Sequence, residues 1–154
     1  MSSRFVGALI LLGAATWAAP GWPQDTGERD IAGKYLRVGS ASVSLEIERG
    51  RGDIRAVVSG GGPPGPSGAA AADCIIVAAG VMRDGQLRAI FQPIETDIFS
   101  YRPAKADAEK RKLIVDFSPG VAEVQRADTF GYCGLGIDFL GTYRKMRKGQ
   151  KRHA

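Results

Sequence analysis

Hydrophobic and polar residues alternate along several short stretches of the chain. The clearest stretch is residues 41–48, in which serine and glutamate separate four apolar residues, Ala41, Val43, Leu45 and Ile47. Successive side chains of a β-strand point to opposite faces, so this spacing predicts a strand with one buried face. Similar runs follow as far as Arg144, and turn-forming pairs such as Asp84-Gly85 separate them.

The alternating runs together predict an all-β domain. The predicted strands number about eight and cover residues 33–38, 41–48, 53–59, 74–82, 87–92, 113–117, 121–126 and 135–143. Residues 74–82 differ from the others in being apolar throughout. Residues 104–111 are polar and predict no more than a short helical turn. Most connections are short enough for hairpins, which favours a small antiparallel β-barrel of the lipocalin-like kind with about eight strands, or a sandwich.

The first and last predicted strands carry similar motifs. Gly33-Lys34-Tyr35 lies in the first strand and Gly141-Thr142-Tyr143 lies in the last. From this similarity we expect the two strands to be neighbours that close a barrel, because closure removes the free edges of a sheet. The last strand is also rich in glycine, which in strands often marks a bulge or a bend.

The last strand contains one acidic residue on its mixed face. The alternation from residue 135 to residue 143 predicts one continuous strand whose apolar face includes Ile137, Phe139 and Tyr143. Asp138 lies on the opposite face. We expect Asp138 either to pair with Arg144 or Lys34 or to be exposed to solvent.

Residues 60–72 form a low-complexity insert of glycine, proline and alanine with a single serine. It has no large apolar side chain to bury, and its glycine and proline residues disfavour a hydrogen-bonded ladder, so we expect a surface loop. The insert lacks the Gly-Lys-Ser/Thr ending of a phosphate-binding loop.

The N-terminus has the pattern of a secretory signal peptide. Arg4 precedes an uncharged apolar run over residues 5–15, and small residues before Ala18 predict cleavage after residue 18, with Gly21 as the alternative end. The remaining predicted parts are a flexible leader (19–30), the barrel domain (31–145) and a disordered basic tail (146–154). Arginine outnumbers lysine and asparagine is absent, a bias typical of GC-rich bacterial genomes, so we expect a periplasmic or secreted bacterial protein.

The chain has two cysteines, Cys74 and Cys133, and both follow the predicted signal peptide. An even cysteine count in an exported protein predicts a disulfide bond. The alternative is two reduced, buried thiols, which a cytosolic location would favour. The two cysteines are far apart in sequence, so neither a redox Cys-x-x-Cys pair nor a zinc site is indicated.

Composition restricts the chemistry that the chain can perform. The formal net charge is +5, but the basic residues from Arg144 onwards account for it, and the rest of the domain is close to neutral. The single histidine, His153, lies in the tail, so neither a Ser-His-Asp arrangement nor a histidine metal cluster is expected. Glu46 and Glu48 lie on the same face of a predicted strand, and a solvent-exposed outer face is enough to explain both. We therefore expect no catalytic residue, no metal and no cofactor.

Four residues form a candidate protein-binding site. Phe99, Tyr101, Arg102 and Tyr132 combine aromatic rings with arginine, the residue types that most often anchor protein interfaces. The alternative is that the aromatic residues cap one end of the barrel. The basic tail could contact anionic surfaces of the cell envelope, but it lacks the interleaved aromatic residues of a specific nucleic-acid site.

In residues 131–144, Gly-Tyr-Cys-Gly-Leu-Gly-Ile-Asp-Phe-Leu-Gly-Thr-Tyr-Arg, the chain resembles small exported bacterial β-domains. Most such domains have no assigned function, and some occur alongside lysozyme-inhibitor families. This resemblance implies a disulfide-tied periplasmic barrel with an inhibitory or envelope-binding role. The leading hypothesis is therefore a non-enzymatic binding module of the lysozyme-inhibitor-like kind, with a protein partner in the envelope.

Two other functions remain open from the sequence. The first is a lipocalin-like carrier of a small apolar ligand, which needs an interior cavity and is excluded if the interior is filled by Leu45, Ile47, Phe91, Phe117 and Phe139. The second is a hydrolase, which needs carboxylates that converge in a cleft.

Overall fold

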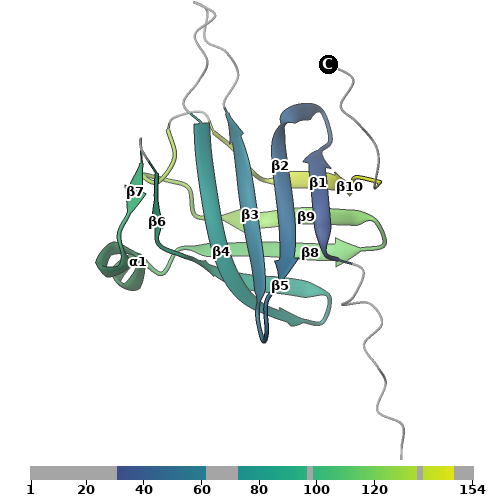
Figure 1. The fold of residues 1–154 in the computed structure, drawn as a ribbon. Helices are drawn as coiled ribbons and strands as arrows, with labels where there is room; N and C mark the ends of the chain where they lie inside the picture. Colours follow the sequence, from purple (N-terminus) through teal and green to yellow (C-terminus); the bar gives the residue numbers. More distant parts are fainter. Residues whose placement is uncertain (1–30, 62–72, 97–98, 135–136, 148–154) are drawn as a thin grey trace, which may run out of the picture.

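The computed structural model describes residues 31–61, 73–96, 99–134 and 137–147. The predicted signal peptide and leader, most of the insert and most of the basic tail lie outside these ranges. Within them, eight strands form a closed antiparallel barrel in the order β1-β10-β9-β8-β5-β4-β3-β2 (Figure 1). The predicted all-β class and barrel architecture are confirmed.

Each barrel strand corresponds to one of the predicted runs, although β10 overlaps only the end of the last one. The strands are β1 (Gly33–Arg37), β2 (Ser40–Arg49), β3 (Ile54–Gly61), β4 (Asp73–Arg83), β5 (Gln86–Phe91), β8 (Lys112–Ser118), β9 (Val121–Ala127) and β10 (Gly141–Lys145). A small second sheet pairs β6 (Ile94–Glu95) with β7 (Ser100–Tyr101), and it is followed by α1 (Pro103–Glu109). Figure 1 shows β1 to β4 crossing steeply in front of β8, β9 and β10.

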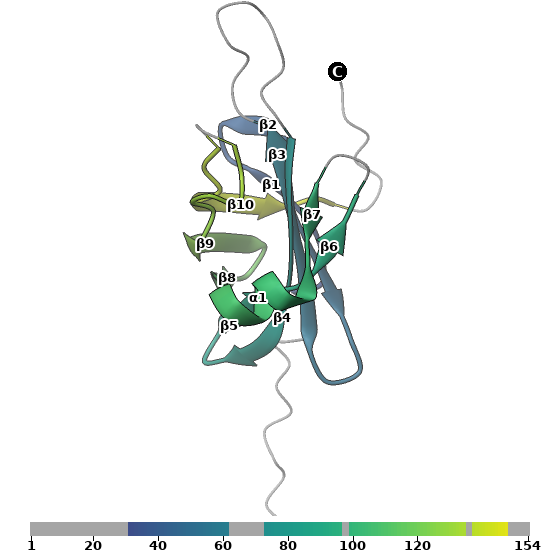
Figure 2. The ribbon, with the colours of Figure 1, turned by 90° about the vertical axis from the view of Figure 1, so that its left-hand side faces the viewer.

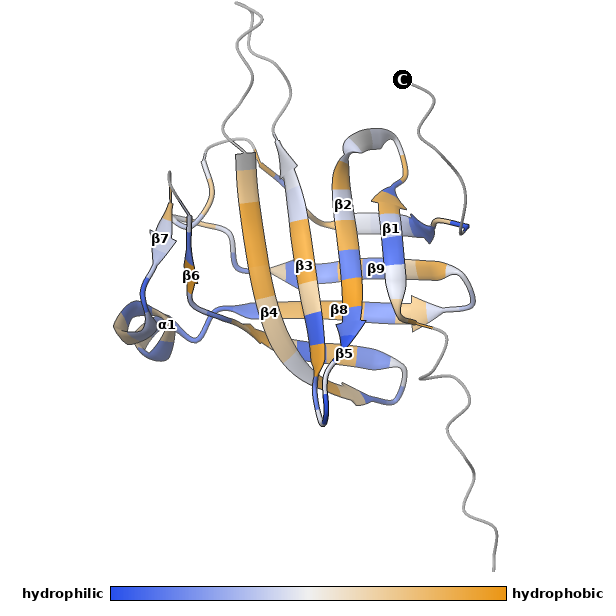
Figure 3. Ribbon diagram, in the orientation of Figure 1, coloured by the Kyte–Doolittle hydropathy of each residue, from blue (hydrophilic) through white to orange (hydrophobic). Residues whose placement is uncertain are grey.

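The interior of the barrel is filled by the apolar side chains of the alternating runs. Leu45, Ile47, Phe91 and Phe139 are each no more than 2% exposed, and Phe117 is partly buried against them. Figure 3 shows the alternation of polar and apolar residues along β2 and β3. Burial of an aliphatic or aromatic side chain is worth about 1.5–3 kcal/mol, so this core is the main source of stability.

The barrel closes between its first and last strands, as the Gly-x-Tyr motifs predict. β1 pairs with β10, with Tyr35 opposite Lys145 and Arg37 opposite Tyr143. Both motif tyrosines are buried, and each hydroxyl donates to the carbonyl oxygen four residues earlier, Tyr35 to Ile31 and Tyr143 to Phe139, both at 2.7 Å.

The prediction of a continuous strand over residues 135–143 is wrong for residues 137–140, because β10 begins only at Gly141. Burial still alternates there, with Phe139 buried and Asp138 and Leu140 exposed. The amide of Leu140 donates to the side chain of Asp138 at 2.9 Å, which forms a local turn, and Gly141 has a φ of +117°. The side chain of Asp138 thus accepts the hydrogen bond that the Leu140 amide would otherwise donate to a neighbouring strand.

The predicted insert begins too early. Gly60 and Gly61 belong to β3 and pair with Cys74 and Asp73 of β4. A side chain at Gly60 would lie 2.9 Å from a methyl group of Val43 on β2. Glycine therefore extends the ladder at this position, because the backbone passes close to its neighbour. Residues 62–72 lie outside the described ranges.

The connection from β5 to β8 covers one end of the barrel. Figure 2, viewed from that side, shows α1, β6 and β7 in front of β4 and β5. Pro103 starts the helix, where its missing amide proton costs nothing, and Lys110 ends it in a left-handed conformation. Among the described residues, no helix has the length and hydrophobicity needed to cross a membrane.

Candidate functional site

The segment after β9 crosses the end of the barrel and is fastened to β4. Cys133 forms a disulfide bond with Cys74, with 5.5 Å between their Cα atoms, so the predicted pairing is confirmed. The amides of Tyr132 and Cys133 both donate to the carbonyl of Thr129, at 2.9 and 3.0 Å. Gly131 has a φ of +67°, which few residues other than glycine adopt. We call residues 128–134 the clamped loop.

Tyr132 is the buried anchor of the clamped loop. Its ring makes edge-to-face contacts with Phe91, Phe99 and Tyr101, at centroid distances of 5.1, 4.9 and 4.9 Å. Its hydroxyl donates to the carbonyl of Ile75 on β4 at 3.1 Å. Burial raises the pKa of Tyr132 to about 12, and the nearby Tyr101 adds to the rise while Arg111 opposes it. The hydroxyl therefore acts as a neutral donor.

Arg111 fixes the other side of the clamped loop. Its Nη1 donates to the main-chain carbonyls of Asp128 and Phe130, both at 2.6 Å. Its Nε pairs with Glu109, and its guanidinium lies 5.8 Å from the centre of the Tyr132 ring. Only arginine combines so many donors in one planar group, so a single side chain holds two backbone carbonyls of the loop and a carboxylate.

Carboxylates neutralise the charges at the base of the loop. The hydrogen bond from Arg111 lowers the pKa of Glu109, and the hydrogen bond from Arg126 lowers that of Asp128. Asp128 also accepts a 2.9 Å hydrogen bond from the amide of Lys112. Both carboxylates are therefore ionised and serve to hold the loop in place.

Phe130 lies at the tip of the clamped loop and is 93% exposed. Its backbone is held by Arg111, and the neighbouring Tyr132 and Cys133 are held by aromatic packing and the disulfide bond. The fold thus rigidly presents a large aromatic side chain to solvent. Phe130 was not among the predicted site residues, because nothing in its immediate sequence distinguishes an exposed phenylalanine from a buried one.

The structure brings the four predicted protein-binding residues to one end of the barrel but gives them different environments. Tyr101 and Tyr132 are 1% and 7% exposed, and Phe99 is partly buried. This packing is the capping arrangement that was the alternative interpretation. Arg102 is exposed, and its carbonyl accepts the first hydrogen bonds of α1. Phe99 and Tyr101 pack against Tyr132 of the clamped loop, whereas the ring of Phe130 faces solvent.

Asp138 pairs with a residue that the sequence analysis did not consider. Asp138 is exposed to solvent, as one of the two alternatives predicted. Its ion pair is with Arg37 and not with Arg144 or Lys34, and Nη2 of Arg37 lies 3.3 Å from its carboxylate. Nη1 of Arg37 also donates to the Asp138 carbonyl at 2.6 Å. The bend before β10 turns Asp138 towards β1, which explains the difference.

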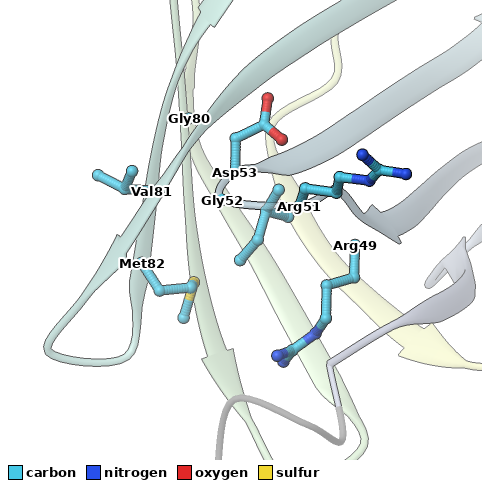
Figure 4. A pocket seen from close by; sticks show the side chains of 9 residues that line it. Arg49, Arg51, Gly52, Asp53, Gly80, Val81 and Met82 are labelled. Atoms are coloured by element: carbon cyan, nitrogen blue, oxygen red, sulfur yellow. The ribbon is translucent and has the colours of Figure 1, made fainter.

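A shallow cleft of about 250 Å³ lies at the opposite end of the barrel, between the β2–β3 turn and the end of β4. Figure 4 shows Met82 directed towards the turn and Val81 directed away from it. The side chains of Arg49 and Arg51 extend in different directions, and Asp53 adds a negative charge on the same turn. These charged groups do not converge on one point, so the two arginines do not form a bidentate anion-binding site in the cleft.

The carboxylates and cysteines of the described residues do not gather around a point that could hold a metal ion. Glu48 pairs with Arg55 at 2.6 Å on the outer surface of the barrel, as expected for a solvated strand face.

Comparison of the chain with protein-family models, curated proteins and solved structures finds no significant match.

Proposed function

We propose that this protein is an exported, non-enzymatic binding module that recognises a protein partner through the clamped loop. The observation that carries the proposal is Phe130, which is 93% exposed on a loop whose backbone is fixed by Arg111 and by the Cys74–Cys133 disulfide bond. Aromatic residues are frequent anchors of protein interfaces, and a rigid loop loses little conformational entropy on binding.

The disulfide bond supports the proposed location. Stable disulfides belong to oxidising compartments such as the bacterial periplasm or the extracellular medium. The packed core favours a binding surface over an internal ligand chamber, because Leu45, Phe91 and Phe139 fill positions that a lipocalin-like carrier would leave open. A lysozyme is the partner we propose first, as the resemblance of residues 131–144 implies.

The proposal is tested by measuring inhibition of several lysozyme types by the purified protein. We expect one type to be inhibited. We expect Phe130→Ala to weaken inhibition about 10- to 100-fold, because that factor corresponds to the free energy of burying one phenylalanine side chain. The control is Val38→Ala, which truncates a side chain that is 53% exposed on the β1–β2 turn. It should leave inhibition unchanged.

Two results would count against the proposal. If no lysozyme type is inhibited, the lysozyme version is wrong. If inhibition occurs but is insensitive to Phe130→Ala while circular dichroism shows an intact fold, the clamped loop is not the binding surface.

A further inference from the structure

Basic residues on the outer surface of the barrel have two kinds of neighbour. On the side formed by β1, β2 and β3, the strand register places Lys34 opposite Glu46 and Arg55 opposite Glu48. The Arg55–Glu48 pair is a direct salt bridge. Cross-strand pairs of opposite charge are the usual arrangement on a solvated sheet.

The side formed by β4, β5 and β8 is different. The register places Arg88 between Val81 and Ile114, and it places Lys112 opposite Ile90. Arg88 and Lys112 are both exposed, and Arg88 donates to the neutral side chain of Gln86. Arg88 therefore has aliphatic neighbours on both flanking strands, where Lys34 and Arg55 face carboxylates. Lys112 has Ile90 on one side and Asp128 on the other, and the carboxylate of Asp128 is bound by Arg126 and by the amide of Lys112.

Several aliphatic side chains on this side are exposed to solvent, and Ile114 is partly buried. Val81 is 44% exposed and Ile90 is 37% exposed, and Ile75 at the start of β4 is 38% exposed. Figure 3 shows β4 as hydrophobic along most of its length, although one of its faces is on the outside of the barrel. Val81 and Ile90 are diagonal neighbours in the β4–β5 ladder, and exposed apolar residues that gather on one face of a monomer commonly mark an interaction site.

We propose that this outer surface, which we call the cationic face (Val81, Arg88, Ile90, Lys112 and Ile114), binds the surface of an anionic lipid bilayer. Short aliphatic side chains between long cationic ones match a surface of negative headgroups above hydrocarbon. Arginine and lysine extend past valine and isoleucine, so their charges reach headgroups while the aliphatic groups contact the acyl boundary. A nucleic acid would instead favour aromatic side chains, on which its bases stack.

The full chain is tested by co-sedimentation with vesicles of phosphatidylcholine alone and of phosphatidylcholine mixed with phosphatidylglycerol. We expect binding at low salt to the vesicles that contain phosphatidylglycerol, and release at high salt because charge attraction is screened. The Arg88→Gln, Lys112→Gln double variant should lower the partition coefficient about 25-fold, since each basic residue near an anionic membrane contributes about fivefold.

The matched control is the Lys34→Gln, Arg144→Gln double variant. It removes the same charge from β1 and β10, which lie opposite β5 and β4 in the ring of strands. The control should keep wild-type partitioning. All variants carry the same basic tail, so binding that the tail alone produced would be unchanged in both pairs.

The inference is overturned by any of four results: no binding to phosphatidylglycerol vesicles at low salt, equal losses in both double variants, wild-type partitioning in both double variants, or binding to single-stranded DNA in place of vesicles. It stands apart from the clamped loop. Phe130→Ala should bind vesicles like the wild type, and the Arg88, Lys112 double variant should keep any inhibition that depends on Phe130. A loss of vesicle binding in Phe130→Ala would assign the membrane contact to the loop and not to the cationic face.

Discussion

Tyr35 and Tyr143 occupy equivalent places in two copies of one short motif. In each copy a large apolar residue, Ile31 or Phe139, is followed two residues later by glycine and four residues later by tyrosine. The glycines have φ values of +135° and +117°, and each tyrosine hydroxyl returns to the carbonyl of the apolar residue. A buried hydroxyl without a partner would be costly, so the local bend and the hydrogen bond depend on each other.

Buried tyrosines make the protein sensitive to alkaline pH. Burial raises the pKa of both Tyr132 and Tyr143 to about 12 from an ordinary value of 10.0. The folded state therefore holds these protons more tightly than the unfolded state, so the contribution to stability is complete below pH 10 and is lost as the pH rises towards 12.

We expect tyrosinate absorbance to show that Tyr132 and Tyr143 ionise only near pH 12, together with the loss of β-structure in circular dichroism. The Tyr143→Phe variant provides the control, because one delayed ionisation should disappear from its titration. Ionisation of Tyr132 and Tyr143 near pH 10 in a protein that keeps its circular dichroism would contradict the burial of these hydroxyls.

At the level of single elements, the strands were predictable because a period-two pattern gives one face to the core and the other to solvent. The start of β10 was not, because residues 137–140 keep that alternation of burial without pairing in the ladder. Arg111 could not be assigned either, because its contacts join residues 17 and 19 positions apart in sequence. Local patterns report the burial of a side chain, but they do not report which backbone group it meets.

Gly80 shows how one residue shapes an element. It lies in β4 opposite Ala89 of β5, and a Cβ atom there would lie 2.0 Å from the carbonyl oxygen of Arg88. Because that neighbour is backbone, β4 and β5 would have to separate. Gly80→Ala should therefore lower the free energy of unfolding by about 1–3 kcal/mol, as overpacking usually does.

Urea denaturation measures this effect against Gly52→Ala. A Cβ atom at Gly52 meets nothing within 4 Å, so that variant should stay within about 0.5 kcal/mol of the wild type. Similar stabilities for the two variants would show that β4 and β5 are not in close contact at Gly80.

At the scale of the whole molecule, the chain is closed twice. The β1–β10 ladder completes the ring of strands, and the disulfide bond separately ties the segment before β10 to β4. The ring could be predicted from the repeated Gly-x-Tyr motif and the disulfide from the cysteine count. The exposed position of Phe130 could not, because it results from the contacts of its neighbours with distant parts of the barrel.

The two closures predict that the barrel survives loss of the disulfide bond at reduced stability. The bond spans 59 residues, and a crosslink over a loop of that size stabilises a protein by roughly 4 kcal/mol. The Cys74→Ala, Cys133→Ala double variant should lose about that much in guanidinium denaturation and keep its far-ultraviolet circular dichroism. Amide exchange should accelerate at Tyr132 and at position 133, whose hydrogen bonds to Thr129 lie beside the lost crosslink. A variant without β-structure in the absence of denaturant would show that the strand ladder cannot close the barrel by itself.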